Sequence, residues 1–279
     1  MDWLDALILG IVQGLAEYLP ISSSGHLEIC SKILGLNLSG ADSLQFDLVL
    51  HVATVLSTIV VLWKRFMPLC SSFFTLKRDE NTTYVWKIIL SCVPVGIVGL
   101  CFKKQVESFF GVSEDGGNNL IVVGICLCIT AALLTFAHLF REKDFRKGPS
   151  AGRDISWSDA LVIGIGQAIA VLPGLSRSGT TIATGIILGD KRIQVAQFSF
   201  FMVIIPILGE AFLDFIKILK AAPGDEQIAV GLLPMAVGFV ASFLVGCMAC
   251  KWMIDLVSRG KLVWFALYCV AVGILCICW

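Results

Sequence analysis

Two serine- and glycine-rich turns contain most of the residues in this chain that could do chemistry. The first reads Ser22-Ser23-Ser24-Gly25-His26, and the second reads Ser176-Arg177-Ser178-Gly179-Thr180. Glu17 lies shortly before the first turn. A serine hydroxyl with a nearby histidine and carboxylate can act as nucleophile, base and orienting group. An arginine presents a planar cationic fork that fits phosphate. Together the turns predict a site that binds and attacks a phosphate-bearing group.

The two turns belong to a duplicated segment. Residues 3–25 and 157–179, aligned without gaps, have the same residue at 11 of 23 positions. Paired, interrupted apolar segments in a chain of this kind indicate a binding site where two repeats meet. Glu17 follows Gln13 by four positions, so both side chains share one face of the first helix. We therefore expect Ser23, His26, Glu17 and Arg177 to be the catalytic residues.

The remaining polar groups of the turns are expected to bind phosphate oxygens, helped by backbone N–H groups at the starts of two short helices. This set comprises Gln13, Ser22, Ser24, Gly25, Ser176, Ser178, Gly179, Thr180 and Thr181.

Each assignment has a structural alternative. Clustered Ser and Thr side chains can simply cap helices, His26 can be a satisfied core histidine, and Arg177 can form a structural ion pair with Glu17. We interpret His51 and His138 as helix-packing residues.

The composition indicates an integral membrane protein. Hydrophobic residues make up 57% of the chain and charged residues 15%, against about 25% charged in soluble domains. The net charge is zero, so no nucleic-acid partner is expected. The first apolar run follows Met-Asp-Trp-Leu-Asp without a basic segment, which argues against a cleavable signal peptide. Most of the 11 cysteines lie inside apolar runs, and we expect no disulfide.

Hydropathy divides the chain into six full-length segments and two short pairs. A spanning helix needs about 20 apolar residues, and segments of that length occur at 44–63, 85–102, 118–140, 193–216, 230–252 and 262–279. The short pieces at 3–19 with 27–36, and at 157–172 with 181–189, are read as re-entrant hairpins whose turns face the protein interior. We predict an all-α polytopic membrane protein with two re-entrant helical hairpins and about six transmembrane helices.

The distribution of Lys and Arg predicts how the repeats are oriented. The segments 64–84, 141–156, 190–192 and 251–261 carry 14 basic residues, against five in or near the opposite-side segments. The positive-inside rule makes the first group cytoplasmic. Three spans separate the hairpins, so the hairpins must enter from opposite faces. We predict one membrane domain over 1–279, with inverted repeats at about 1–140 and 155–279.

At these turns the chain resembles a known family. Gln13-x-x-x-Glu17 followed by Pro20-Ile21-Ser22-Ser23-Ser24-Gly25-His26 is similar to the first signature of bacterial undecaprenyl-diphosphatases of the bacitracin-resistance type. Pro173-Gly174-Leu175-Ser176-Arg177-Ser178-Gly179-Thr180-Thr181 is similar to the second. The resemblance covers essentially the whole chain, in length, motif order and hydropathy.

The resemblance implies hydrolysis of undecaprenyl diphosphate to the monophosphate and inorganic phosphate, in a multi-pass protein of the bacterial inner membrane. This reaction recycles the lipid carrier for peptidoglycan and other wall polymers and gives bacitracin resistance. The active site would open to the outer face. Ser23 is the implied nucleophile, with His26 left open for that role.

The resemblance also implies a divalent cation, Mg²⁺ or Ca²⁺, held in part by Glu17. Gln13 stands where other members have Glu, so it brings no second negative charge to a metal. Enzymes of this kind often dimerise, which adds a homodimer to the expectations.

Two other functions compete. Inverted repeats with broken helices are also transporter architecture, so a polyprenyl-phosphate transporter or flippase could use the same pocket. An unrelated acid-phosphatase-like membrane family also has a Ser-Gly-His string. That family needs a histidine after its Ser-Arg pair, and none follows Arg177.

Overall fold

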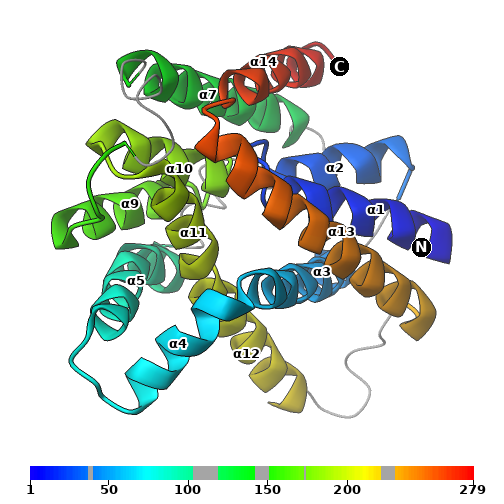
Figure 1. Cartoon of the computed structure of the whole chain (residues 1–279). Helices are drawn as coiled ribbons and strands as arrows, with labels where there is room; N and C mark the ends of the chain where they lie inside the picture. Colours follow the sequence, from blue (N-terminus) through cyan, green and yellow to red (C-terminus); the bar gives the residue numbers. More distant parts are fainter. Residues whose placement is uncertain (37–39, 103–118, 142–150, 173, 221–229) are drawn as a thin grey trace.

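The structure, a computed structural model, describes residues 1–36, 40–102, 119–141, 151–172, 174–220 and 230–279 (Figure 1). Regular structure in these ranges is helical, apart from one isolated bridge between Arg153 and Asp190. Several residues used in the sequence argument lie outside the described ranges: Lys103, Lys104, Lys143, Arg146, Lys147 and Pro173.

Both re-entrant hairpins are present as pairs of short helices. The first consists of α1 (Trp3–Ala16) and α2 (Ser23–Ile33), and the second of α9 (Trp157–Ile169) and α10 (Arg177–Leu188). The second helix of each pair begins four residues earlier than predicted, at 23 instead of 27 and at 177 instead of 181. The reason is N-capping: the hydroxyls of Ser22 and Ser176 accept hydrogen bonds from backbone N–H groups and start the helices there.

The other helices follow the predicted segments with shifted boundaries. They are α3 (Gly40–Val61), α4 (Trp63–Phe74), α5 (Glu80–Ile97) with the π-helix η1 (Val98–Phe102), α7 (Asn119–Phe140), α11 (Arg192–Met202), α12 (Ile204–Lys220), α13 (Leu232–Ser258) and α14 (Val263–Cys278). The predicted connection at 64–84 was wrong in part, because it contains α4, which is bent by 91° from α3. The apolar face of α4 packs beneath α5, and this amphipathic pattern explains why the segment is helical.

By length and composition, fewer helical stretches qualify as membrane spans than the six that the sequence predicted. Three stretches are long and apolar enough to cross a membrane, namely Leu120–Phe140, Arg192–Leu213 and Leu232–Ser258, and the bent α3–α4 pair makes a fourth. The predicted spans at 85–102 and 262–279 correspond to α5 with η1 and to α14, and α14 has only 16 residues. Helices therefore occupy all six predicted positions, but not all as straight, full-length spans.

Each hairpin packs against the other half of the chain. Helix α1 lies along α13, α9 lies along α5, and α7 lies along α14. Equivalent glycines in the two copies permit this: a side chain at Gly10 would meet the Gly238 carbonyl of α13, and one at Gly164 would meet the Ser91 carbonyl of α5. Figure 1 shows the hairpins on opposite sides of the molecule, with their broken ends toward the centre. Such reciprocal packing is what a pair of two-fold related repeats produces.

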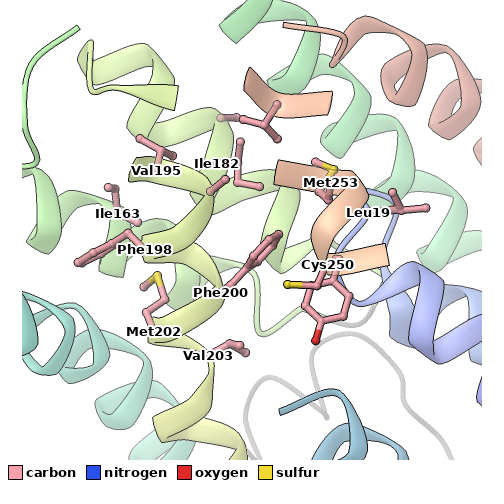
Figure 2. Close-up of a cluster of buried hydrophobic side chains, with 14 of the residues drawn as sticks. Leu19, Ile163, Ile182, Val195, Phe198, Phe200, Met202, Val203, Cys250 and Met253 are labelled. Atoms are coloured by element: carbon pink, nitrogen blue, oxygen red, sulfur yellow. The ribbon is translucent and has the colours of Figure 1, made fainter. Parts of the chain in front are cut away.

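The hydrophobic core lies where the two halves interlock. Figure 2 shows Phe198 and Met202 on one side of α11, toward Ile163 of α9, and Phe200 on the other side, toward Met253 and Cys250 of α13. Phe198, Met202 and Met253 are fully buried. Helix α11 therefore gives α10 and its N-terminal turn a rigid support.

Candidate active site

The first turn is held in an unusual backbone conformation. Ser22 caps α2 with a φ of 72°, and its hydroxyl accepts a hydrogen bond from the Gly25 N–H at 3.2 Å. A positive φ is uncommon for a residue other than glycine, Asn or Asp. The Ser22 carbonyl accepts from the His26 backbone N–H at 3.2 Å and from His26 Nδ1 at 2.8 Å. These bonds fix the direction in which Ser23, the next residue, leaves the turn.

The second turn has the same serine cap, but its capping serine has an ordinary negative φ. Ser176 caps α10 with a φ of −70°, and its hydroxyl accepts from the Gly179 N–H at 3.0 Å. Its own N–H donates to the Thr130 hydroxyl of α7 at 3.1 Å. Ser176 is completely buried. Arg177 is thus the first residue of a helix whose start is fixed by the core.

Glu17 joins the two turns. Its Oε2 accepts hydrogen bonds from the Ser23 hydroxyl at 3.0 Å and from Gln13 Nε2 at 2.9 Å. Its Oε1 accepts a short, charge-assisted hydrogen bond from the Arg177 guanidinium. Glu17 is 8% exposed, so its carboxylate is shielded from water, whereas the Arg177 side chain is 26% exposed. The structure therefore brings Gln13, Glu17, Ser23 and Arg177 together, as the duplicated turns predicted.

Most of the other hydroxyls form hydrogen bonds with backbone groups. Ser22 and Ser176 cap their helices, the Ser178 hydroxyl donates to the Leu19 carbonyl at 3.1 Å, and the Thr180 hydroxyl donates to the Ser176 carbonyl at 2.8 Å. The Thr181 hydroxyl contacts the Arg177 carbonyl and Ser199. Capping, the structural alternative, thus accounts for these side chains in this state. Ser24 is exposed and lies 3.4 Å from the Ser22 hydroxyl.

The glycines of the two turns have a packing role. A side chain on Gly25 would come within 3.0 Å of Val123, and one on Gly179 within 3.0 Å of Ser176 and Thr130. Both positions lie where the hairpins approach α7. Their small size lets each turn pack closely against α7.

His26 lies beside the first turn but faces away from Glu17. Because the Ser22 carbonyl can only accept, His26 Nδ1 must carry the proton of that hydrogen bond. Its Nε2 lies 2.8 Å from the hydroxyl of Tyr268 on α14, and the two rings are nearly parallel with centroids 5.6 Å apart. Ser23 and His26 make no direct contact in this conformation, so the predicted proton exchange between them has no direct path. Glu17, rather than His26, is the group within hydrogen-bond distance of Ser23.

Two residues near the site were not predicted from the sequence. The Nε2 atom of His51 on α3 lies 3.5 Å from Glu17 Oε2, although we interpreted His51 as a packing residue. Tyr268 contacts His26, as described above. Polarity within an apolar helix was the available signal for both, since ionisable and polar groups at membrane depth are candidates by default.

A small cavity opens beside the ion pair. Glu17 and Arg177 line it together with residues of α3, α11 and α12. The lining residues are Glu17, Tyr18, Thr54, Val55, Thr58, Arg177, Ser178, Ser199, Phe200, Val203 and Ile207. A lining that combines charged groups with apolar side chains suits a molecule with an anionic head and a hydrocarbon chain.

The donors around Glu17 fit a divalent cation only in part. No group of three His, Cys, Asp or Glu side chains gathers anywhere in the described ranges. One oxygen is nevertheless available next to Glu17: Gln13 Oε1 is buried and has no hydrogen-bond partner. Mg²⁺ and Ca²⁺ take six or more oxygen ligands. A cation here would depend on oxygens from a bound phosphate group and from water.

Comparison with known proteins agrees with this geometry. The family described as bacitracin resistance protein BacA matches residues 6–275. The chain is 49% identical over 275 residues to a protein of Bacteroides thetaiotaomicron named undecaprenyl-diphosphatase, covering 98% of this chain and 97% of that one. It is 50% identical over 279 residues to proteins of the same name from Bacteroides fragilis and Parabacteroides distasonis, covering 99% of this chain and 98% of each. The chain is therefore a multi-pass membrane protein that belongs to the BacA bacitracin resistance family.

Proposed function

We propose that this chain hydrolyses undecaprenyl diphosphate to undecaprenyl phosphate and inorganic phosphate. Relatives that share about half of their residues with it over their full length carry the name of that activity. The observation that carries the proposal is the Glu17 carboxylate, which contacts Ser23 of one hairpin and Arg177 of the other. Hydrolysis at this site returns the lipid carrier to cell-wall synthesis, and it accounts for the bacitracin resistance in the family's description.

Ser23 and Glu17 can perform the first step. The Ser23 oxygen attacks the terminal phosphorus of the diphosphate, a new Oγ–P bond forms, and the bond to the bridging oxygen breaks. Undecaprenyl phosphate leaves, and the serine proton passes to Glu17 Oε2, which already accepts it as a hydrogen bond at 3.0 Å. Water then attacks the phosphorus of the phosphoserine, the Oγ–P bond breaks, and the proton held by Glu17 returns to the Ser23 oxygen as inorganic phosphate leaves.

Arg177 stabilises the charge on the transferring phosphoryl group. Its guanidinium has five N–H donors, so the bond to Glu17 leaves others free for phosphate oxygens. The same residue holds Glu17 in place for Ser23. Positioned donors that meet developing charge in a site shielded from water make a large contribution to catalysis.

The lipid chain would lie along the apolar side chains of the cavity. Val55, Phe200, Val203 and Ile207 are the aliphatic and Phe residues that line it. They would hold the first part of the hydrocarbon chain while the diphosphate contacts Arg177.

The identity of the nucleophile can be tested by trapping the phosphoenzyme. We expect rapid acid quenching of the enzyme with labelled substrate to capture a phosphate ester on Ser23, which survives acid. A phosphoramidate, which acid destroys and alkali preserves, would instead assign the nucleophile to His26.

A divalent cation is part of the proposal. Glu17 and the unpaired Gln13 Oε1 would hold it together with the diphosphate. When bound, Mg²⁺ or Ca²⁺ would neutralise charge on the diphosphate. We expect EDTA to lower phosphate release and added cation to restore it.

We propose that the site opens to the outer face of the bacterial inner membrane. The support is the resemblance of the two turn motifs to the family, since the excess of Lys and Arg in the segments assigned to the cytoplasm orients the chain but leaves the turns near the midplane. A homodimer is a further proposal, and the mass of the detergent-solubilised protein tests it.

A transporter remains the second candidate function, because reciprocally packed hairpins meeting at a central pocket are also found in carriers. Purified protein in detergent separates the two functions. Release of inorganic phosphate from undecaprenyl diphosphate, lost in Ser23→Ala, supports the phosphatase. Tight binding of the lipid without release, unaffected by Ser23→Ala and His26→Ala, supports the carrier.

A further inference from the structure

The hydrogen bond between Tyr268 and His26 connects the last helix of the chain to the first turn. Tyr268 lies on α14, 242 residues from His26 in sequence, and its hydroxyl is 2.8 Å from His26 Nε2. Since Nδ1 carries the proton donated to the Ser22 carbonyl, Nε2 of the neutral ring is an acceptor, and the phenol must donate. Both ring nitrogens of His26 are therefore engaged.

The position of α14 makes this contact specific. The Cys269 thiol, adjacent to Tyr268, donates to the carbonyl of Pro20 at 3.6 Å. One helical turn further, Gly273 packs against Gly124 of α7 so closely that a side chain on either glycine would strike the other's carbonyl. Helix α14 thus rests on both α7 and the first turn, and it holds the phenol in place.

The hydrogen bonds continue from Tyr268 toward the nucleophile. The phenol donates to His26, and His26 donates to the Ser22 carbonyl. Ser22 has a φ of 72°, a conformation that persists only when surrounding contacts hold it. The peptide after Ser22 leads to Ser23, whose hydroxyl donates to Glu17.

We propose that Tyr268 is a positioning residue of the active site. It acts through His26: by donating to Nε2 it fixes the plane of the imidazole ring, and the ring in turn holds the strained Ser22 carbonyl that orients Ser23. This role rests on the proposed function, because it assigns Ser23 as the nucleophile. Tyr268 itself does not line the cavity beside Glu17 and Arg177, so it has no part in binding the substrate head.

The test combines kinetics with a measurement that does not depend on activity. Tyr268→Phe removes the hydroxyl and keeps the ring. We expect kcat to fall by about three- to tenfold, the size of one neutral hydrogen bond, with KM almost unchanged. Nitrogen NMR of isotope-labelled histidine, recorded at alkaline pH, should show the unprotonated Nε2 resonance of His26 move to the position of a nitrogen that accepts no hydrogen bond.

Tyr84→Phe is the matched control. Tyr84 lies on α5, packs against Phe198 and Phe201, and has no contact with the turns. We expect this variant to keep the wild-type kcat and the wild-type His26 resonance.

The outcomes separate this inference from the proposed function. An unchanged Nε2 resonance in Tyr268→Phe, or a loss that appears only in KM, overturns the role of Tyr268. If the wild-type protein releases no phosphate, the proposed function fails, while the shift of the Nε2 resonance still decides whether Tyr268 positions His26.

Discussion

The two re-entrant hairpins share the same helix-capping pattern but carry different reactive side chains. Each begins with a capping box, formed by Asp2 with Asp5 in α1 and by Ser156 with Asp159 in α9. Each breaks at a serine that caps the next helix.

The side chains on this shared frame differ at the positions that matter. Val171 stands where the first copy has Glu17, Arg177 where it has Ser23, and Thr180 where it has His26. The first hairpin supplies the nucleophile and base, and the second supplies the cation. Neither contains a complete site.

The backbones of the two turns differ as well. Ser22 has a φ of 72° and Ser176 a φ of −70°, and Ser24 of the first turn is exposed whereas the equivalent Ser178 is buried. The strained, more open turn carries the group that must react with the substrate. The relaxed, buried turn carries the group that must stay in place. This difference is consistent with strain being concentrated at reactive positions.

The largest difference in phosphate release should appear between variants of a serine in the first turn and a serine in the second. Ser23→Ala removes the proposed nucleophile, and we expect phosphate release to fall by at least about 10⁴-fold. Ser178→Ala removes only a hydroxyl bonded to the Leu19 carbonyl, and we expect a loss below about tenfold. Initial rates on undecaprenyl diphosphate measure both. Similar losses in the two variants would mean that the turns do not divide the chemistry in this way.

Arg177→Ala should have the next largest effect. It removes the phosphate clamp and leaves the buried Glu17 carboxylate without its arginine partner. We expect phosphate release to fall by about 10³-fold. The free energy of unfolding should fall by about 2 kcal/mol, less than for a fully buried pair, because the Arg177 side chain is 26% exposed.

Arg177→Lys is the control for charge. It keeps the cation and loses the planar fork, so we expect it to recover most of the stability and little of the activity. Full activity in Arg177→Lys would show that a positive charge without the planar fork is enough to stabilise the transferring phosphoryl group.

The ends of the hairpins differ in charge, which predicts a pH effect on stability. Asp190, in the linker between α10 and α11, stands where the first copy has Leu36. Burial, followed by the neighbouring Asp159 carboxylate, raises the pKa of Asp190 to about 7. The folded protein therefore keeps a proton that the unfolded chain loses above about pH 4.

The sign of this effect follows directly. The contribution of Asp190 to stability is greatest below about pH 4 and is lost as the pH rises to about 7. Asp190→Asn should unfold at a higher temperature than the wild type above neutral pH, with the difference shrinking in acid. Thermal unfolding in detergent measures it.

Asp154→Asn should show the reverse pH dependence. The pKa of the exposed Asp154 is lowered by hydrogen bonds from Lys191 and Gln194. The variant should be less stable than the wild type near neutral pH and equal to it in strong acid.

The smallest effect concerns the backbone of the turns. Glycine adopts a positive φ without strain, so Ser22→Gly should lose a cap but relieve the backbone. Ser176→Gly loses the cap without that gain. We expect Ser22→Gly to be the more stable of the two by about 1 kcal/mol, measured by denaturation in mixed micelles. Equal stability would contradict the strain at Ser22.

Sequence periodicity and duplication predicted the helical class, both hairpins and the meeting of their two turns, whereas the ion pair of Arg177 with Glu17 was the structural alternative for Arg177. The repeat made this possible, because it aligned two turns that are far apart in the chain. The short α4 was missed, since Lys64 and Arg65 at its start and the charged residues that follow it at 77–80 made the whole segment resemble a polar connection. The side-chain partner of His26 could not be predicted from the sequence either. Tyr268 contacts it only through the packing of α14 on α7, which no local pattern encodes.

The central claim is that the two hairpins form one site through Glu17 and Arg177. A double-mutant cycle tests it most directly, with kcat/KM for phosphate release measured in Glu17→Gln, Arg177→Ala and the double variant. Residues that act as a unit give a double variant hardly worse than the more damaged single variant, and this is the result we predict. Losses that multiply in the double variant would contradict the claim, because each hairpin would then contribute on its own.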